Sequence, residues 1–234
     1  MANSTNQNIP QRISGAIFDL DGTILDTMEQ WDTLGLRYLQ DNKIEPKQDF
    51  LDRIGTMSLR ESAQLFHDEY GVPLEVDRII EDLVERLRNL YLKEAKAKPG
   101  AIETLRFLKR SGVDLAVATA TTRELAVNGL RLVGGLDFFS EIFSCRDPHI
   151  KESKRSPKIY NLARKFLGSP LKETIVVEDA LYALETAKKA GFFIVAIEDP
   201  SERTRKEQIQ KLADVYVNNH FELHEWLQNN IRWE

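Results

Sequence analysis

The chain has 234 residues, of which 42% are hydrophobic and 29% are charged, with 12 glycines and 8 prolines. This composition suits one large domain or a domain with an insertion, and it excludes disordered, collagen-like and low-complexity proteins. The formal net charge of −5 argues against nucleic acid or an anionic membrane as a partner.

The N-terminal residues 1–12 are polar and lack the basic end and apolar run of a secretory signal. The longest apolar runs, such as residues 192–197, fall far short of the roughly 20 residues that a membrane-spanning helix needs. The single cysteine, Cys145, cannot form a disulfide within the chain, and we interpret it as a small buried hydrophobe. We therefore expect a cytoplasmic protein, and we favour a monomer.

Short apolar and β-branched runs alternate with helical patterns along most of the chain. The expected strands are 16–18, 115–118, 174–177, 192–197 and 215–217; the expected helices are 101–109, 122–132, 156–167 and 180–190, with a closing helix from Glu222. Glycine follows each of the first four helices, as a C-cap favours. The alternation predicts an α/β fold with a doubly wound parallel sheet and right-handed crossovers.

Residues 28–98 break this alternation, because they show helical periodicity and no convincing strand. A loop at 55–58 interrupts the segment, and Pro99 and Gly100 mark its end. We interpret residues 28–98 as an all-helical cap inserted between the first two core strands. The α/β core then consists of residues 1–27 and 99–234.

Carboxylates gather where the expected strands end. Asp19 and Asp21 follow the first strand, Thr119 the second, and Glu178 and Asp179 the third. Ligands of parallel α/β sheets bind outside these strand ends, and clustered carboxylates repel one another unless a cation lies among them. An oxygen-only cluster suits Mg²⁺. The structural alternatives are that the first two aspartates shape a turn and that Asp179 is an ordinary N-cap.

Other polar and aromatic groups have simpler explanations. Asp199 precedes Pro200, which favours a helix start. His220 and His224 have metal-binding spacing but no nearby third ligand, so a structural or solvent-facing role is preferred over zinc. Three aromatic residues are assigned to the core rather than to a stacking platform, namely Phe138, Phe139 and Phe143.

The motifs together resemble those of the haloacid dehalogenase superfamily of phosphotransferases. Residues 19–23 (Asp-Leu-Asp-Gly-Thr) resemble its first motif, Thr119 the second, Lys154 in Lys-Arg-Ser-Pro the third, and Glu178-Asp179 the fourth. The resemblance implies that Asp19 is the nucleophile and Asp21 the acid/base. It also implies that Thr119 and Lys154 contact phosphate, and that Asp19, the Asp21 carbonyl, Glu178 and Asp179 bind Mg²⁺.

The helical insertion resembles the cap of the branch that holds phosphoglycolate phosphatase, sugar-phosphate phosphatases and β-phosphoglucomutase. The expected enzyme is a Mg²⁺-dependent phosphatase of a small phosphorylated metabolite, acting through an aspartyl-phosphate. A phosphosugar mutase and a noncatalytic sensor of phosphorylated ligands are the alternatives. The mutases of this branch carry a histidine where this chain has Trp31, which counts against the mutase.

The sequence also offers substrate contacts and departs from the family pattern at a few positions. The candidate substrate contacts in the insertion are Trp31, Arg53, Thr56, Ser58 and Arg60, with core packing or solvated helix charge as the structural alternatives. The departures are Ala120 after the second-motif hydroxyl, Ser153 before the third-motif lysine and Lys158 after its proline.

Overall fold

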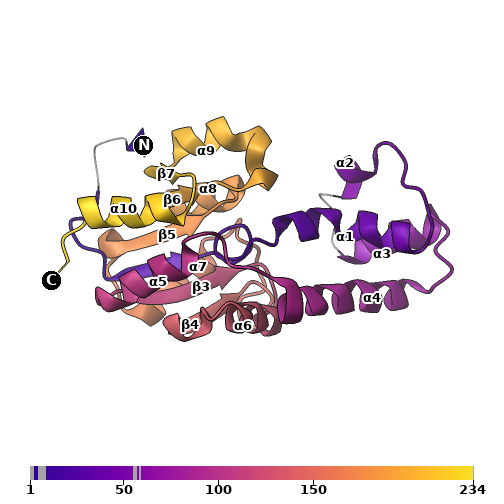
Figure 1. Ribbon diagram of the computed structural model, residues 1–234, viewed down its shortest axis with the longest axis horizontal. Helices are drawn as coiled ribbons and strands as arrows, with labels where there is room; N and C mark the ends of the chain where they lie inside the picture. The colour runs from indigo at the N-terminus through magenta and orange to yellow at the C-terminus, as the bar shows by residue number, and fades with distance from the viewer. Residues whose placement is uncertain (1–2, 5–8, 55–56, 58, 234) are drawn as a thin grey trace.

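A computed structural model describes residues 3–4, 9–54, 57 and 59–233. Its strands are β1 (Asn3–Ser4), β2 (Gly15–Phe18), β3 (Asp114–Thr119), β4 (Glu141–Ser144), β5 (Thr174–Glu178), β6 (Phe193–Ile197) and β7 (Val215–Val217). They form one sheet in the order β1-β7-β6-β5-β2-β3-β4 (Figure 1). Six strands are parallel and only the short edge strand β1 pairs antiparallel, with β7.

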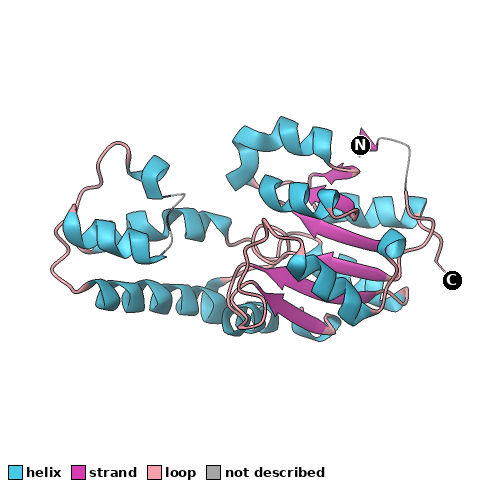
Figure 2. Ribbon diagram, turned by 180° about the vertical axis from the view of Figure 1, so that it is seen from behind, coloured by secondary structure: helices cyan, strands magenta, loops and turns pink. Residues whose placement is uncertain are grey.

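Helices cover both faces of this sheet (Figure 2). One face packs against α5 (Ala101–Arg110), α6 (Arg123–Leu132) and α10 (His220–Asn230). The other face packs against α7 (Lys158–Leu167), α8 (Leu181–Lys189) and α9 (Lys206–Leu212). Three short helical turns lie in the connections, η2 (Leu136–Phe138), η3 (Leu171–Glu173) and η4 (Pro200–Arg205). The predicted doubly wound α/β fold is confirmed.

The five predicted strands and the intervening helices are present, with ends displaced by two residues or fewer. Two strands were not predicted, β1 and β4. β4 begins with Glu141 and ends with Ser144, so it lacks the continuous apolar run that identifies a central strand. It pairs with β3 alone, at the edge of the sheet.

All elements between residues 28 and 94 are helical and extend beyond the carboxyl ends of the strands (Figure 1). They are α1 (Met28–Asp41), α2 (Phe50–Ile54), α3 (Leu59–Asp68), α4 (Val76–Asn89) and the π-helical turn η1 (Leu90–Glu94). These helices bury a cluster of their own, which includes Tyr38, Phe50 and Phe66. The aromatic rings of Tyr38 and Phe66 stack with centroids 5.6 Å apart.

The two chain segments that join this helical insertion to the sheet lie side by side. The N–H of Asp26 donates to the carbonyl of Lys96 at 2.9 Å, and the N–H of Lys98 donates to that of Ile24 at 2.8 Å. Leu25 and Ala97 form an isolated antiparallel bridge between these bonds. The insertion is therefore anchored directly beside residues 19–23.

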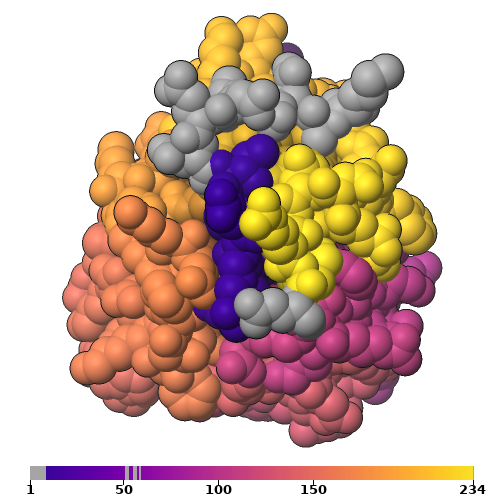
Figure 3. Space-filling view, turned by 90° about the vertical axis from the view of Figure 1, so that its left-hand side faces the viewer, coloured from indigo at the N-terminus to yellow at the C-terminus, as the bar shows by residue number. Residues whose placement is uncertain are grey.

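At the end of the molecule opposite the insertion, the segment before β2 packs against the segment that follows α10. In Figure 3 the segment before β2 (indigo) runs down the middle of this face. The residues before and around β5 (orange) lie on one side of it, and α10 with the residues that follow it (yellow) lies on the other. The N–H of Arg232 donates to the carbonyl of Gln11, and that of Ser14 to the carbonyl of Glu173, each at 3.0 Å. Among the described residues, no helix combines the length and apolar content needed to cross a membrane.

The simpler explanations for peripheral residues are confirmed. Asp199 begins η4 and its carboxylate accepts the N–H of Ser201 at 3.0 Å. His220 is buried with Nε2 2.8 Å from the carbonyl of Thr23, and the ring of His224 lies 4.5 Å from that of Phe107. The assigned core aromatics contact the core, and Cys145 is buried.

Candidate active site

Asp19 is the first residue beyond β2, in the middle of the sheet. Its N–H donates to the carbonyl of Val177 on β5 at 3.0 Å. β2 pairs in parallel with β3 on one side and β5 on the other, so the carboxyl ends of all three strands meet at one edge. Ligands of doubly wound sheets bind at such a point, where the order of strands reverses. The fold therefore brings Asp19, Thr119 and Glu178 to the same edge.

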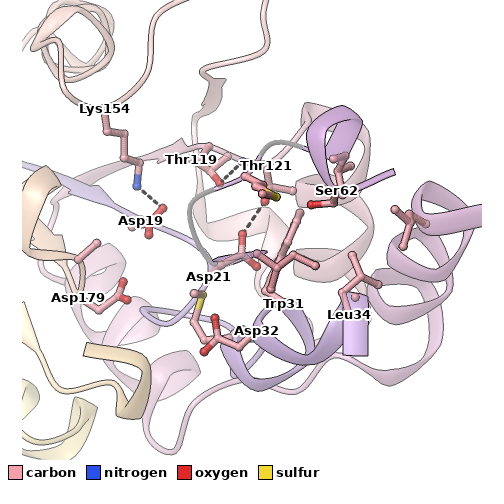
Figure 4. Close-up of a pocket in the computed structure, with 18 of the residues that line it drawn as sticks. Asp19, Asp21, Trp31, Asp32, Leu34, Ser62, Thr119, Thr121, Lys154 and Asp179 are labelled. Atoms are coloured by element: carbon pink, nitrogen blue, oxygen red, sulfur yellow. Dashed lines mark hydrogen bonds and ion pairs between the residues drawn. The ribbon is translucent and has the colours of Figure 1, made fainter. Parts of the chain in front are cut away.

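Lys154 reaches this edge from the loop between β4 and α7, and it is 2% exposed. Its ammonium forms an ion pair with the carboxylate of Asp19 (Figure 4). It also donates to Oε1 of Glu178 at 2.5 Å, and the hydroxyl of Tyr160 donates to the same oxygen at 3.2 Å. Lys154 thus bridges the ends of two neighbouring strands through their carboxylates.

The carboxylates of this cluster repel one another in a buried site. Burial and the charge of Glu178 raise the pKa of Asp19 to about 8, although Lys154 opposes this shift. Burial, and then the charges of Glu178 and Asp19, raise the pKa of Asp179 well above its usual range. Burial disfavours the charge of Lys154, but Asp19 and Glu178 hold its pKa well above the ordinary value. One ammonium does not offset three carboxylates, so a further cation would stabilise the cluster.

Asp179 approaches the cluster from the segment between β5 and α8. Its Oδ1 accepts the hydroxyl of Thr23 at 2.9 Å. The N-cap of α8 is Ala180, so Asp179 is not the N-cap that the structural alternative assumed. Gly22 has φ +79°, and a Cβ there would lie 2.8 Å from Cγ of Asp179. Residues 19–23 thus pack tightly against Asp179.

The three carboxylates are suitably arranged for a divalent cation. Asp19, Glu178 and Asp179 each offer a ligand oxygen, and these atoms lie within 4.8 Å of one another. Oxygen-only donor sets suit Mg²⁺. Glu178 is also anchored elsewhere, because its Oε2 accepts the N–H groups of Asp179 at 3.0 Å and Ala180 at 3.3 Å. The donor set fits the expected metal.

Asp21 lies beside the insertion and away from Lys154 (Figure 4). Three hydroxyls donate to its carboxylate: Thr27 to Oδ1 at 2.6 Å, Tyr91 to the same oxygen, and Thr121 to Oδ2 at 2.7 Å. The carboxylate oxygens of Asp21 are thereby held in one orientation at the wall of the cavity. Thr121 therefore links two site residues: its backbone N–H donates to Thr119 and its hydroxyl donates to Asp21.

Thr119 is buried at the end of β3, and its hydroxyl accepts the N–H of Thr121 at 3.0 Å. A hydroxyl that accepts a hydrogen bond still has its own proton, so Thr119 can donate to a ligand. Ala120 lines the cavity without a polar side chain. Thr121 supplies the hydroxyl on this turn, but directs it to Asp21.

The two residues near Lys154 that depart from the family pattern, Ser153 and Lys158, form hydrogen bonds within its loop. The ammonium of Lys158 donates to the carbonyl of Ile150 and to Oε1 of Glu152, each at 2.9 Å. The hydroxyl of Ser153 accepts the N–H of Arg155 at 3.4 Å. Lys158 therefore ties the start of α7 to the segment that precedes Lys154.

A cavity of about 400 Å³ lies between this edge and the insertion. Of the candidate substrate contacts, Trp31 lines this cavity, while Thr56 and Ser58 lie outside the described residues. Arg53 and Arg60 are not among its lining residues: Arg53 pairs with Glu69 at 2.6 Å and Arg60 with Asp77 at 2.8 Å. The insertion also contributes Met28, Asp32, Leu34, Met57, Leu59, Ser62, Phe66 and Leu83, and the core adds Arg146, Tyr182 and Glu202.

Two residues that hydrogen-bond to the site carboxylates had no signal in the sequence. Tyr91 reaches Asp21 across 70 positions of the chain, and Tyr160 reaches Glu178 from inside α7. Both resemble ordinary core aromatics on amphipathic helices. The carboxylates and Lys154 could be found because each belongs to a short motif beside a strand end or helix start.

A family model described as haloacid dehalogenase-like hydrolase matches residues 16–197. A phosphorylated carbohydrates phosphatase of Thermotoga maritima is 26% identical over 76% of this chain and 82% of its own length. Hexitol phosphatase A of Escherichia coli is 24% identical over 85% of this chain and 89% of its own.

Solved structures share the fold at lower identity. The structure of β-phosphoglucomutase from Clostridium difficile superimposes with a TM-score of 0.68 at 23% identity, covering 93% of this chain and 96% of that one. The family match and the phosphatase names of the relatives support the expected enzyme class, a phosphoric monoester hydrolase. With the strand-end carboxylates and the matched residues 16–197, this chain belongs to the haloacid dehalogenase-like hydrolase family.

Proposed function

We propose that this chain is a Mg²⁺-dependent phosphatase of small phosphorylated metabolites, most of all sugar phosphates, and that Asp19 forms an aspartyl-phosphate. One observation carries the proposal: Lys154 lies buried between Asp19 and Glu178, with Asp179 in the same cluster. In this cluster a candidate nucleophile lies beside an ammonium and among carboxylates that can hold a divalent cation. Phosphoryl transfer depends chiefly on positioning and on offsetting charge.

Asp19, Asp179, the backbone carbonyl of Asp21 and Glu178 would hold the Mg²⁺. When bound, the metal offsets the charge of the phosphate and of the cluster. Lys154 contributes a second positive charge from within the protein. Two unit charges 4 Å apart repel by about 4 kcal/mol at an effective dielectric of 20, so the phosphate dianion needs this compensation to approach Asp19.

In the first step, a carboxylate oxygen of Asp19 forms a bond to phosphorus and the bond to the leaving oxygen breaks. The Asp21 carboxyl gives its proton to that leaving oxygen. In the second step, water forms the new bond to phosphorus, the Asp19–phosphorus link breaks, and the proton of the water passes to Asp21. Thr119 donates its hydroxyl to a phosphate oxygen throughout.

The cavity favours a leaving group that carries hydroxyls. Asp32 and Glu202 present carboxylates that accept hydrogen bonds, and Ser62 presents a hydroxyl. A substrate with a second anionic group, such as phosphoglycolate, would face those carboxylates with Arg146 as its cation. The names of two relatives, a phosphorylated carbohydrates phosphatase and a hexitol phosphatase, support the same class of substrate. The insertion would act as a cap that excludes water from the first step.

The test is release of inorganic phosphate from a panel of hexose, pentose and hexitol phosphates and phosphoglycolate, with Mg²⁺ or with a chelator. We expect release only with Mg²⁺, and a loss on the order of a thousandfold or more for Asp19→Asn. The exposed Asp26, on the same loop, gives the matched control Asp26→Asn, which should keep its activity. Turnover by Asp19→Asn near the wild-type rate would refute the mechanism.

The same samples separate the alternatives. None of the four histidines lines the cavity where its residues are described, and Trp31 donates its N–H to Tyr91 at 2.8 Å. Phosphorus NMR of a sugar 1-phosphate should therefore show inorganic phosphate. Conversion to another sugar phosphate without phosphate release would indicate a mutase, and binding without turnover would indicate a sensor.

A further inference from the structure

The hydroxyl of Tyr91 joins the helical insertion to Asp21. Tyr91 is fully buried on η1, at the segment through which the insertion returns to the sheet. Its hydroxyl donates to Oδ1 of Asp21 and lies 3.4 Å from the hydroxyl of Thr121. The indole N–H of Trp31, on α1, donates to the same Tyr91 oxygen at 2.8 Å.

The direction of these bonds follows from the chemistry of the groups. An indole N–H can only donate, so Tyr91 must accept from Trp31. The one proton of the Tyr91 hydroxyl is then free to point at Asp21. Burial and the charge of Asp21 keep the pKa of Tyr91 well above its usual value, so the hydroxyl keeps that proton. The insertion thus supplies two successive hydrogen bonds, from Trp31 to Tyr91 and from Tyr91 to Oδ1 of Asp21.

The backbone around Tyr91 departs from a regular α-helix. α4 changes into a π-helical turn at Leu90, where the N–H of Ala95 donates to the carbonyl of Leu90 at 2.9 Å. A π-turn holds an extra residue and so rotates the side chains around it relative to a regular helix, and such turns are frequent at functional sites. The irregular turn thus sets the direction in which Tyr91 leaves the helix.

A second element leaves room for the ring. Gly129 lies inside α6, a position where glycine is less favourable than alanine for helix stability. A Cβ at Gly129 would lie 2.8 Å from Cδ1 of Tyr91 and 2.7 Å from Cδ1 of Leu25. The glycine accordingly accommodates the Tyr91 ring against α6.

We infer that Tyr91 is a positioning residue: it holds the Asp21 carboxyl in the orientation that protonates the leaving oxygen, and it makes that orientation depend on the docked insertion. This inference rests on the proposed acid/base function of Asp21. Tyr91 itself touches neither the phosphate nor the attacking atoms in this scheme.

The test replaces Tyr91 by phenylalanine, which keeps the ring against Gly129 and removes one hydroxyl. kcat/KM includes the departure of the leaving group and excludes the later hydrolysis of the aspartyl-phosphate. For a sugar phosphate, whose alkoxide needs a proton, we expect kcat/KM to fall about tenfold or more, the effect of losing a hydrogen bond to a charged group. For p-nitrophenyl phosphate, whose phenolate leaves unaided, we expect a change of about threefold or less.

Two further variants keep the test decisive. Tyr38→Phe removes another buried tyrosine hydroxyl of the insertion, one that donates to Asp82 at 3.4 Å, and should leave both substrates unaffected. Gly129→Ala keeps the hydroxyl but displaces the ring, and should reproduce the selective loss on the sugar phosphate. It also tests the inference if Tyr91→Phe unfolds.

The possible outcomes separate this inference from the proposed function. Suppose that the wild type releases phosphate but that Tyr91→Phe lowers kcat/KM equally for both substrates, or for neither. Tyr91 then does not position the acid. If the wild type itself releases no phosphate from any substrate, or Asp19→Asn remains active, it is the proposed function that fails.

Discussion

Lys154 combines deep burial with a position beside the proposed nucleophile, Asp19. Its ammonium is buried between Asp19 and Glu178, so removing it would leave two buried carboxylates without their counter-charge. Breaking a buried pair by deleting one partner is strongly destabilising, because the remaining charge keeps its desolvation penalty. The burial of Lys154 therefore indicates that removing its ammonium costs stability as well as activity.

We therefore predict that Lys154→Met lowers the free energy of unfolding by about 3 kcal/mol and abolishes phosphate release. Adding Glu178→Gln removes one of the unpaired charges and should restore part of the stability but none of the activity. Urea denaturation of the two single variants and the double variant measures the coupling between the residues. Strictly additive losses would show that Lys154 and Glu178 do not interact.

His220 makes the stability of the fold depend on pH. Burial, with a smaller effect of Lys98, lowers its pKa to about 4, while the carbonyl of Thr23 and the charge of Glu103 oppose the shift. Between pH 6.5 and 4 the unfolded chain therefore takes up a proton at His220 and the folded chain does not, so acid favours unfolding.

The free energy of unfolding should fall by up to about 3 kcal/mol from this residue as the pH drops from 6.5 to 4. In His220→Gln that part of the fall should disappear, and the difference between variant and wild type should narrow toward pH 4. Denaturation midpoints across this pH range measure it. Parallel pH profiles for the two proteins would contradict the assignment.

Which site residues the sequence could reveal depends on how locally they are encoded. Asp19, Lys154 and Asp179 occupy short motifs beside strand ends and helix starts, so the motif and the sheet pattern together place them at one edge. Tyr91 and Thr121 could not be placed in this way. Their role depends on a contact between the insertion and the turn after β3, which only the folded chain shows.

At the scale of elements, the loop after β2 is shaped by its glycine. Gly22 combines a left-handed φ of +79° with close approach to Asp179, so this loop lies directly against the carboxylate that we propose as a metal ligand. A side chain would need both backbone strain and displacement of Asp179. The chain offers a control at Gly112, which has φ +77° and nothing within 4 Å of an added Cβ.

Gly22→Ala should raise the Mg²⁺ concentration needed for half-maximal activity by about tenfold or more, because displaced ligating groups typically weaken metal binding by that factor. Gly112→Ala has the same backbone strain and should cost about 1 kcal/mol of stability, with unchanged Mg²⁺ dependence. A Mg²⁺ titration of both variants tests this. Equal Mg²⁺ requirements would mean that the Gly22 loop does not position the metal ligands.

The sequence predicts the central strands of the sheet but not its edge strand β4. Central strands such as β5 are buried on both faces and appear as continuous apolar runs, so their positions follow from the sequence. β4 has only four residues with polar ends and receives hydrogen bonds from one neighbour. Its strand conformation depends on pairing with β3, which the local sequence does not encode.

At the scale of the whole molecule, the fold places two parts around one cavity. The carboxyl edge of the sheet supplies Asp19, Thr119 and Asp179 to its lining, and the insertion supplies Trp31, the carboxylate of Asp32 and apolar side chains such as Leu34 and Phe66. The paired segments at residues 24–26 and 96–98 hold these parts together immediately beside residues 19–23. We expect movement of the insertion to open and close the cavity about this pair of segments.

Trapping the acyl-phosphate would show whether Asp19 accepts the phosphoryl group. Wild-type protein is mixed with a hydrolysable sugar phosphate and Mg²⁺, quenched within milliseconds and reduced with borohydride, which converts an aspartyl-phosphate to homoserine. Peptide mass spectrometry should find homoserine at position 19 in the wild type and none in Asp19→Asn. Multiple turnovers of phosphate release with no homoserine at position 19, or with homoserine in place of another aspartate, would show that Asp19 does not form the aspartyl-phosphate.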